Sequence, residues 1–323
     1  MNPIDRAEIE SAQKIVYEQM PATPQYEWPQ LSQKLGCKVW LKHENHTPVG
    51  AFKIRGGLVY LHELLQREPH TKGLICATRG NHGQSVAFAA KRYGLHATIV
   101  VPHGNSREKN NAMRALGAEL IEHGDEFQTA KEFACQLAQR QGLHMVPSYH
   151  RDLVRGVATG WIEFFQAVQP DDVLVPIGMG SGFSACAAAR RYCGLQTRII
   201  GVVSAHATAY LQSWQAGAVC EAPVTTQLAD GLACRVPDEQ ALQTLLDEAY
   251  DVVAVSDTEI AQAMRLLFAG THNVAEGAGA AAFAAVMANP ARFASKCVGL
   301  ALTGGNVDSD VFAQVLQGQC KHD

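Results

Sequence analysis

The sequence predicts an α/β protein with two domains, each built on an open sheet of mostly parallel strands. Short apolar runs rich in β-branched residues alternate along the chain with segments long enough for a helix. This rhythm is typical of parallel sheets that helices cover on both faces. The length of 323 residues also exceeds that of one ordinary core, which predicts two domains with a cleft between them.

Eight short apolar runs are the predicted strands, and helical patterns separate most of them. The strands are residues 38–41, 73–77, 97–101, 119–121, 172–177, 198–203, 251–255 and 296–302. Helices are expected over residues 81–93, 107–116 and 127–140, where the gaps are long enough for a crossover between parallel strands. The Ala/Gly-rich residues 275–288 predict a further helix that packs tightly, because small side chains permit close approach.

Composition and charge argue against several classes of protein. The net charge is −4 and there is no basic run, so we expect a small-molecule ligand and no nucleic acid. The first twenty residues contain acidic residues and no continuous apolar stretch, which argues against a signal peptide or a membrane span and favours the cytoplasm. The nine cysteines form no C-x-x-C pair and no H-E-x-x-H is present, so neither disulfides nor a zinc site is expected.

A polar loop follows the strand predicted at residues 73–77. In folds of this kind, ligands bind beyond the carboxyl ends of the strands, in the loops that open the next helix. The loop offers a hydroxyl, a carboxamide and backbone N–H groups at a helix N-terminus, which together suit a carboxylate or another anion. Alternatively, its threonine only caps the helix and its glycine only turns the chain. The loop residues are Thr78, Arg79, Gly80, Asn81 and His82.

A glycine-rich loop follows the strand predicted at residues 172–177. Glycines at this place allow backbone amides to approach a phosphate closely. A dinucleotide-binding fingerprint is less suitable, because its third glycine would fall at Phe183 and the strand at residues 198–203 ends without an acid for a ribose. We therefore expect a single phosphate and not NAD. The loop residues are Gly178, Met179, Gly180, Ser181 and Gly182.

Two further motifs could serve a planar cofactor. Lys53 follows Phe52 at the start of a predicted helix, and a lysine amine can form a Schiff base with an aldehyde such as pyridoxal phosphate. Taken alone, such a lysine is more typical of a solvated first turn. Thr303 ends the strand at residues 296–302 and could offer a neutral hydrogen bond to a ring, although a hairpin or cap would explain it equally well.

Taken together, the four motifs resemble those of the fold type II pyridoxal-phosphate enzymes, in their order and their spacing. The chain is most similar to the threonine/serine dehydratase branch, which includes serine racemase, from about Thr23 to Asp308. The resemblance implies a fold like that of the tryptophan synthase β-subunit, an amino-acid substrate and a homodimer. It also implies that residues 1–50 and 148–323 form a larger cofactor domain and residues 51–147 a smaller, mobile one.

The resemblance implies a role for each motif. Lys53 would carry pyridoxal phosphate covalently, with Phe52 beside the ring, Asn81 at the ring hydroxyl and Thr303 at the ring nitrogen. The loop from Gly178 to Gly182, with Met179 and Ser181 in it, would bind the phosphate. The substrate carboxylate would meet the loop of Thr78, Arg79, Gly80, Asn81 and His82. Since a threonine hydroxyl does not keep the ring nitrogen protonated, the resemblance implies β-elimination, with Lys53 as the base.

The chain departs from the family pattern at Arg79 and at Val203. Arg79 stands where serine racemase has its second acid/base serine, and a guanidinium with a pKa above about 12 is a poor proton shuttle. It could pair with a substrate carboxylate, including one on a side chain, but we expect a structural ion pair. Val203 replaces a carboxylate metal ligand, which leaves Asp230 alone and predicts no metal site. Glu276 matches a family acid near the cofactor, or is only a buried acid at a helix start.

The expected reaction is the dehydration and deamination of a β-hydroxy amino acid to a 2-oxo acid and ammonia. Threonine or serine is the expected substrate, and 3-hydroxyaspartate or a phenylserine-like compound remains an alternative. A serine or aspartate racemase is a second alternative. A non-catalytic amino-acid-binding protein that retains the fold is a third.

Overall fold

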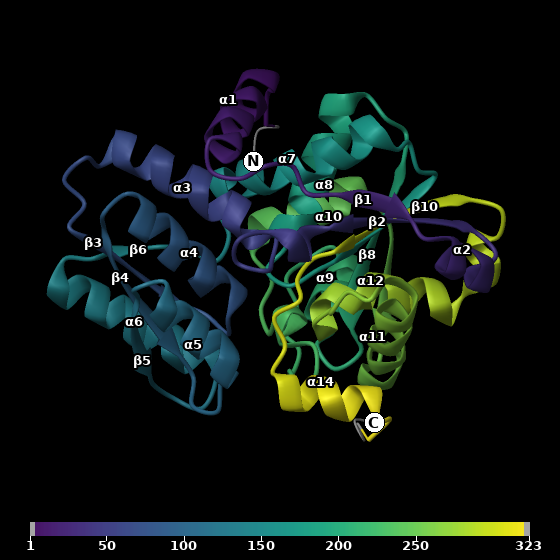
Figure 1. Ribbon diagram of the computed structural model, residues 1–323. Coiled ribbons are helices and arrows are strands. Elements are labelled where there is room, and N and C mark those ends of the chain that lie inside the picture. The colour runs from purple at the N-terminus through teal and green to yellow at the C-terminus, as the bar shows by residue number, and fades with distance from the viewer. Residues whose placement is uncertain (1–3, 320–323) are drawn as a thin grey trace.

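The computed structural model describes residues 4–319, which fold around two open sheets (Figure 1). One sheet has six strands in the order β1-β2-β10-β7-β8-β9, and the other has four in the order β5-β4-β3-β6. Only β1 and β2 pair in antiparallel fashion, and every other neighbouring pair is parallel. The α/β class with parallel-rich sheets is therefore confirmed.

All eight predicted strands are present, with ends that shift by one or two residues, and two short strands were not predicted. The strands of the larger sheet are β1 (Gln25–Glu27), β2 (Lys38–His43), β10 (Cys297–Leu302), β7 (Asp172–Pro176), β8 (Arg198–Ser204) and β9 (Ala249–Val255). Those of the smaller sheet are β5 (Glu119–Glu122), β4 (His96–Val101), β3 (Gly73–Ala77) and β6 (His144–Met145). The unpredicted strands, β1 and β6, are too short to show a periodic pattern.

Helices cover both sheets. They are α1 (Arg6–Tyr17), α2 (Pro29–Leu35), α3 (Lys53–Arg67), α4 (Asn81–Arg92), α5 (Arg107–Ala115), α6 (Phe127–Gln141), α7 (Arg151–Ala167), α8 (Ser181–Cys193), α9 (Ala209–Ala216), α10 (Glu239–Glu248), α11 (Asp257–Thr271), α12 (Gly277–Ala288), α13 (Pro290–Phe293) and α14 (Ser309–Leu316), with 3-10 turns η1 (Glu44–His46) and η2 (Asp230–Leu232). None of these helices combines the length and apolar character that a membrane crossing requires.

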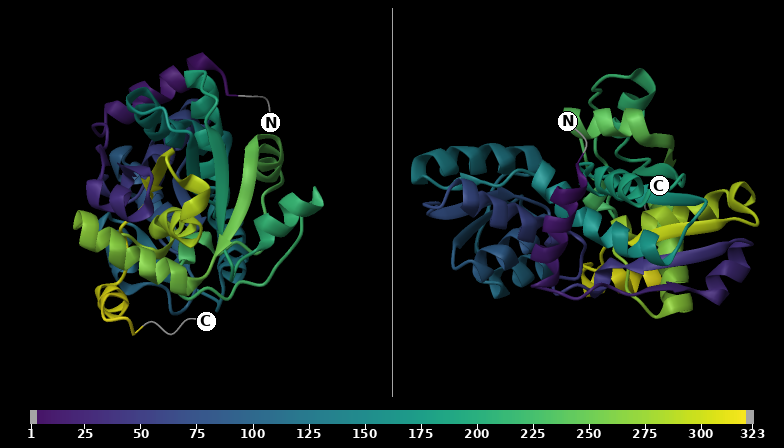
Figure 2. Two further views of the ribbon diagram at one scale, coloured as in Figure 1. Left: turned by 90° about the vertical axis from the view of Figure 1, so that its right-hand side faces the viewer. Right: turned by 90° about the horizontal axis from the view of Figure 1, so that it is seen from above.

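The smaller sheet, with α4, α5 and α6 around it, lies to one side of the larger sheet (Figures 1 and 2). Helix α3 belongs to the smaller group and packs on α7, while α1 lies over both of these helices. The predicted Ala/Gly-rich helix is α12, and its residues from Gly277 to Val286 are buried. Gly279 is required by packing, because a Cβ atom there would lie 2.5 Å from the carbonyl oxygen of Gly304.

Candidate active site

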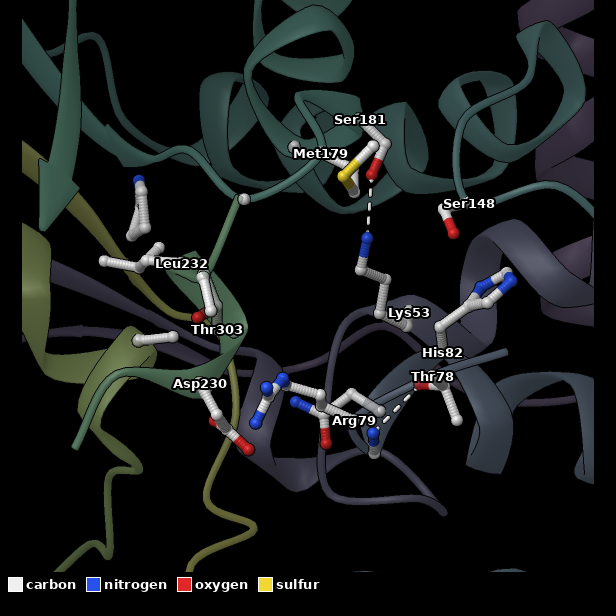
Figure 3. A pocket seen from close by; sticks show the side chains of 18 of the residues that line it. Lys53, Thr78, Arg79, His82, Ser148, Met179, Ser181, Asp230, Leu232 and Thr303 are labelled. Carbon is white, nitrogen blue, oxygen red and sulfur yellow. Dashed lines mark hydrogen bonds between the residues drawn. The ribbon is translucent and has the colours of Figure 1, made fainter. Parts of the chain in front are cut away.

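One pocket between the two sheets brings all the predicted site residues together (Figure 3). Loops at the carboxyl ends of β3, β7 and β10 reach it, as does the start of α3. Residues 52–53, 78–82, 178–182 and 303 all line its wall. The further lining residues include Lys109, Phe127, Ser148, Asp230, Leu232 and Glu276.

Lys53 is a lysine without a carboxylate partner in the described part of the chain. Its Nζ atom donates a hydrogen bond to Ser181 Oγ at 3.0 Å and lies 5.0 Å from the centre of the Phe52 ring. Burial lowers the pKa of this amine to about 8. A larger fraction of the amine is then neutral near pH 7, and the neutral amine is the form that attacks a carbonyl.

The backbone around Lys53 is tied to the strand end that carries Thr303. The N–H group of Phe52 donates to the carbonyl oxygen of Thr303 at 3.0 Å, and Ala51 and Gly304 form a β-bridge. The side chain of Thr303 lines the same pocket. A lysine and a neutral hydroxyl are thus held on adjoining pieces of backbone.

Helix α3 is fixed by a close crossing with α7. A Cβ atom on Gly156 would lie only 2.1 Å from the carbonyl oxygen of Arg55, so the two backbones touch. The side chain of Arg55 is fully buried, and it forms ion pairs with Glu44 at 2.8 Å and with Glu163 at 2.7 Å. These contacts hold the first turn of α3, and therefore Lys53, against the larger sheet.

The glycine loop has the geometry of an anion site. Gly180 has a φ of 91°, and a Cβ atom there would lie 2.5 Å from Ala241 Cβ. Within residues 4–319, the backbone N–H groups of Ser181, Gly182 and Phe183 have no acceptor. Unpaired N–H groups at the N-terminus of a helix favour a phosphate. The loop and Lys53 together fit pyridoxal phosphate.

The loop before α4 combines capping with unpaired donors. Thr78 Oγ1 accepts from the N–H groups of Gly80 at 2.9 Å and Gly83 at 3.3 Å, so this threonine satisfies two N–H groups at the start of the helix. The N–H groups of Asn81 and His82 have no acceptor among the described residues, and they are suited to a carboxylate. Burial and the charge of Lys53 lower the pKa of His82 to about 3, so its ring is neutral.

Arg79 does not form the structural ion pair that we expected. Its side chain lines the pocket, and no ion pair joins it to any acid in residues 4–319. Its Nε atom is buried and has no hydrogen-bond partner there. The prediction was wrong because the acids in this pocket pair with a different cation.

That cation is Lys109 in α5, which the sequence did not single out. Its Nζ atom lies 2.6 Å from Asp230 Oδ2 and 3.1 Å from Glu276 Oε2. Burial would lower the pKa of Lys109, but the two carboxylates raise it above its ordinary value. Glu276 Oε1 also accepts from Asn81 Nδ2 at 2.6 Å, and Asn306 Nδ2 donates to Asn81 Oδ1 at 2.9 Å.

The cluster of Lys109, Asp230 and Glu276 joins the smaller sheet's helices to the larger sheet across the pocket. Asp230, the lone candidate for a metal ligand, is an ion-pair partner of a lysine. Burial raises the pKa of Glu276, although Lys109 opposes this effect. Asp230 and Glu276 stand out in the sequence because each directly precedes a glycine, Gly231 and Gly277 respectively. Lys109 has no such signal, since it lies inside a polar helix.

Comparison with known proteins agrees with this geometry. The family model described as pyridoxal-phosphate dependent enzyme matches residues 17–304. An L-threonine ammonia-lyase of Geobacter sulfurreducens is 36% identical over 88% of this chain and 71% of its own length. An L-threo-3-hydroxyaspartate ammonia-lyase of Saccharomyces cerevisiae is 30% identical over 97% of this chain and 96% of its own length.

Solved structures share the whole architecture. Maize serine racemase superposes with a TM-score of 0.90 at 27% identity, over 98% of both chains. The processed form of threonine deaminase isoform 2 from Solanum lycopersicum gives a TM-score of 0.87 at 26% identity, over 98% of this chain and 94% of that one. The chain therefore belongs to the pyridoxal-phosphate dependent enzyme family, in its threonine/serine dehydratase branch.

Proposed function

We propose that this enzyme, a pyridoxal-phosphate-dependent ammonia-lyase, acts on a β-hydroxy amino acid and releases a 2-oxo acid and ammonia. The observation that carries the proposal is the position of Lys53, an amine without a carboxylate partner in residues 4–319 that shares one pocket with a loop suited to a phosphate. The names of two relatives state ammonia release from L-threonine and from L-threo-3-hydroxyaspartate. Both of these compounds carry a β-hydroxyl group.

The residues of the pocket divide into a cofactor side and a substrate side. Lys53 would hold the cofactor covalently beside Phe52, with Asn81 at the ring hydroxyl and Thr303 at the ring nitrogen. The loop of Gly178, Met179, Gly180, Ser181 and Gly182 would bind the phosphate through its N–H groups. The substrate α-carboxylate would lie at the loop of Thr78, Arg79, Gly80, Asn81 and His82, where two N–H groups are unpaired.

Lys53 has two tasks in the proposed reaction. When bound, pyridoxal phosphate would withdraw electrons from Cα of the substrate. Lys53 Nζ, once released from the cofactor, takes the Cα proton, and a pKa of about 8 suits a base near neutral pH. The Cβ–O bond would break, and the hydroxyl would leave as water with a proton that the cofactor phosphate would supply. The enamine that is released then takes up water and loses ammonia, which yields the 2-oxo acid.

A racemase is the second candidate, because maize serine racemase has the same fold over 98% of both chains. Racemisation needs a second group that can return a proton to the other face of Cα. Arg79 does not suit that task, since a guanidinium stays protonated at all ordinary pH values. Chiral chromatography of the remaining substrate separates the two candidates: enantiomer formation faster than 2-oxo acid release would favour the racemase.

We further propose two domains, a homodimer and a cytoplasmic location. The domain division, with residues 1–50 and 148–323 in the larger domain and residues 51–147 in the smaller, mobile one, is supported by the sheets. All strands of the smaller sheet lie within residues 73–145. The dimer rests on the family resemblance and the location on the composition of the first twenty residues. Analytical ultracentrifugation would test the dimer, and cell fractionation would test the location.

The decisive experiment compares Lys53→Ala with a matched control, Lys34→Ala, which changes an exposed lysine at the end of α2. The purified wild type should absorb light at the violet edge of the spectrum and form 2-oxo acid from threonine, serine or 3-hydroxyaspartate. The Lys53 variant should lose both properties and the control should keep both. A Lys53→Ala protein that still forms 2-oxo acid would contradict the proposal, and a wild type without cofactor absorbance would favour a non-catalytic binding protein.

A further inference from the structure

We propose that Arg79 selects substrates that carry a second acidic group beyond the β-hydroxyl, so that a β-hydroxy amino dicarboxylate such as 3-hydroxyaspartate is preferred to threonine. This inference rests on the proposed function and names its substrate class. It concerns Arg79, a cation of the pocket that has no carboxylate partner in residues 4–319 and no proposed place at the cofactor.

The cations around the pocket differ in what they contact. Lys109 has two carboxylates within ion-pair distance, and Lys53, which donates to Ser181 Oγ, would hold the cofactor. Arg79 is half-buried in the pocket wall, and its buried Nε atom has no partner in residues 4–319. Desolvating a charge without a counter-ion is unfavourable. An anionic ligand that pairs with Arg79 would therefore gain binding free energy, because it supplies the counter-ion that no group in residues 4–319 provides.

The α-carboxylate of a substrate does not require Arg79. Helix α4 has twelve residues, and its N-terminus presents the unpaired N–H groups of Asn81 and His82. The neighbouring N–H groups of Gly80 and Gly83 are already satisfied by Thr78. Two N–H groups at a helix N-terminus suffice for one carboxylate. A guanidinium beside them is then available for a different anionic group.

Arg79 also stands where the pocket opens outward. A larger outer groove adjoins the pocket, and both share Arg79, Phe127, Met179 and Ala233 in their walls. In Figure 3, Lys53 points toward Ser181, while Arg79 and Asp230 lie on the other side of the pocket. A side chain that extends from Cβ, away from Lys53 and toward the opening, would pass Arg79.

The chemistry of the guanidinium favours a carboxylate at this place. Arginine binds a carboxylate through two parallel N–H bonds, which the methyl group of threonine cannot form. A site built to pair with a polar group discriminates strongly against a substrate that lacks it, because the site is then left unpaired. We expect the wild type to prefer L-threo-3-hydroxyaspartate to L-threonine by roughly 100-fold in kcat/KM.

The test compares the wild type with Arg79→Gln, Arg79→Lys and the control Arg92→Gln, which changes an exposed arginine at the end of α4. Arg79→Gln should lose roughly 100-fold in kcat/KM for L-threo-3-hydroxyaspartate and only a few-fold for L-threonine. Arg79→Lys keeps the charge without the planar fork and should lie between them. Arg92→Gln should behave as the wild type does, and cofactor absorbance would verify that every variant is folded.

Inhibition by acids that the enzyme cannot convert provides a second measurement, because it reports binding of the acid and not its conversion. Succinate should inhibit the wild type more strongly than butyrate, and Arg79→Gln should abolish that difference. An equal loss on both amino acids would assign Arg79 to the α-carboxylate, and an unchanged variant would leave it without a role. A wild type that prefers phenylserine would identify an apolar site. Each of these results overturns the inference.

Failure of the proposed function would look different. In that case, the wild type would form no 2-oxo acid from any β-hydroxy amino acid. The comparison of succinate with butyrate, followed through the cofactor absorbance, would still report whether Arg79 binds a second carboxylate.

Discussion

Arg55 is the most heavily bonded side chain near the active-site lysine, and its removal should destabilise the whole protein. Its Nε atom donates to Glu44 at 2.8 Å, and its two terminal nitrogens donate to Glu44, Glu163, Thr23 and Thr159 at 2.7–3.3 Å. Lys42 completes the network through an ion pair of 2.5 Å with Glu163. Two cations therefore balance two anions in a buried site.

The substitution Arg55→Met leaves this site with a net charge of −1. Burial raises the pKa of Glu44, but the charge and hydrogen bonds of Arg55, together with Lys42 and the Thr23 hydroxyl, hold the pKa below its usual value. Without Arg55, the effect of burial is opposed by the more distant Lys42 and by the hydrogen bond from Thr23 Oγ1 at 2.6 Å. Breaking a buried ion pair by removal of one partner costs about 3–5 kcal/mol, because the other charge stays buried without compensation. We expect a loss of that size in the free energy of unfolding at pH 7.

Urea denaturation followed by circular dichroism, at a fixed concentration of pyridoxal phosphate, measures this loss. At pH 5 the loss should be smaller. In the variant, burial raises the pKa of Glu44 above its value in the unfolded chain. The ionised carboxylate therefore lowers the free energy of unfolding at higher pH, and this loss disappears as the pH falls and Glu44 takes up a proton. The matched control is Arg6→Met, which changes an exposed arginine.

The double variant Arg55→Met with Glu44→Gln should recover part of the stability, since it removes the uncompensated charge. A loss below about 1 kcal/mol at pH 7, or a larger loss at pH 5 than at pH 7, would refute this reasoning. The first result would mean that the network stabilises the fold no more than an exposed ion pair does.

Three further predictions follow from the site and from the contact between α5 and α14. The rate at which cofactor-free protein incorporates pyridoxal phosphate, followed by absorbance, should rise with pH to half of its maximum near the pKa of about 8 of Lys53; a midpoint near 10 would contradict this. Gly180→Ala should weaken pyridoxal phosphate binding at least roughly tenfold in equilibrium titration, because the φ of Gly180 is 91° and the added Cβ atom has no space. The control is Gly194→Ala, which lies after the same helix with a φ of 65° and open space around it. This control should cost about 1 kcal/mol of stability and leave the affinity for pyridoxal phosphate unchanged. Asp308→Ala should lower the free energy of unfolding in urea by about 1–2 kcal/mol, because this carboxylate accepts from Ser106 Oγ and from two N–H groups at the start of α5; an unchanged midpoint would show that the contact contributes nothing.

The sequence by itself determined the strands and the loops that follow them. Strands such as β3 and β4 are buried on both faces, so their residues form continuous apolar runs. Such runs can be recognised from the local sequence alone. Since parallel strands end at the same edge of a sheet, motifs that follow them meet in one pocket, and all the predicted site residues line it. The family resemblance could therefore be drawn from four short motifs.

Only the tertiary structure decided which charges pair. Lys109 lies 121 residues from Asp230 in the sequence, yet the two side chains are 2.6 Å apart. This pairing leaves Arg79 without the structural partner that we expected, and it turns a side chain of ambiguous role into the proposed specificity residue. Strand patterns arise from neighbours along the chain, whereas an ion pair depends on a few ångströms between segments that only the packed fold brings together.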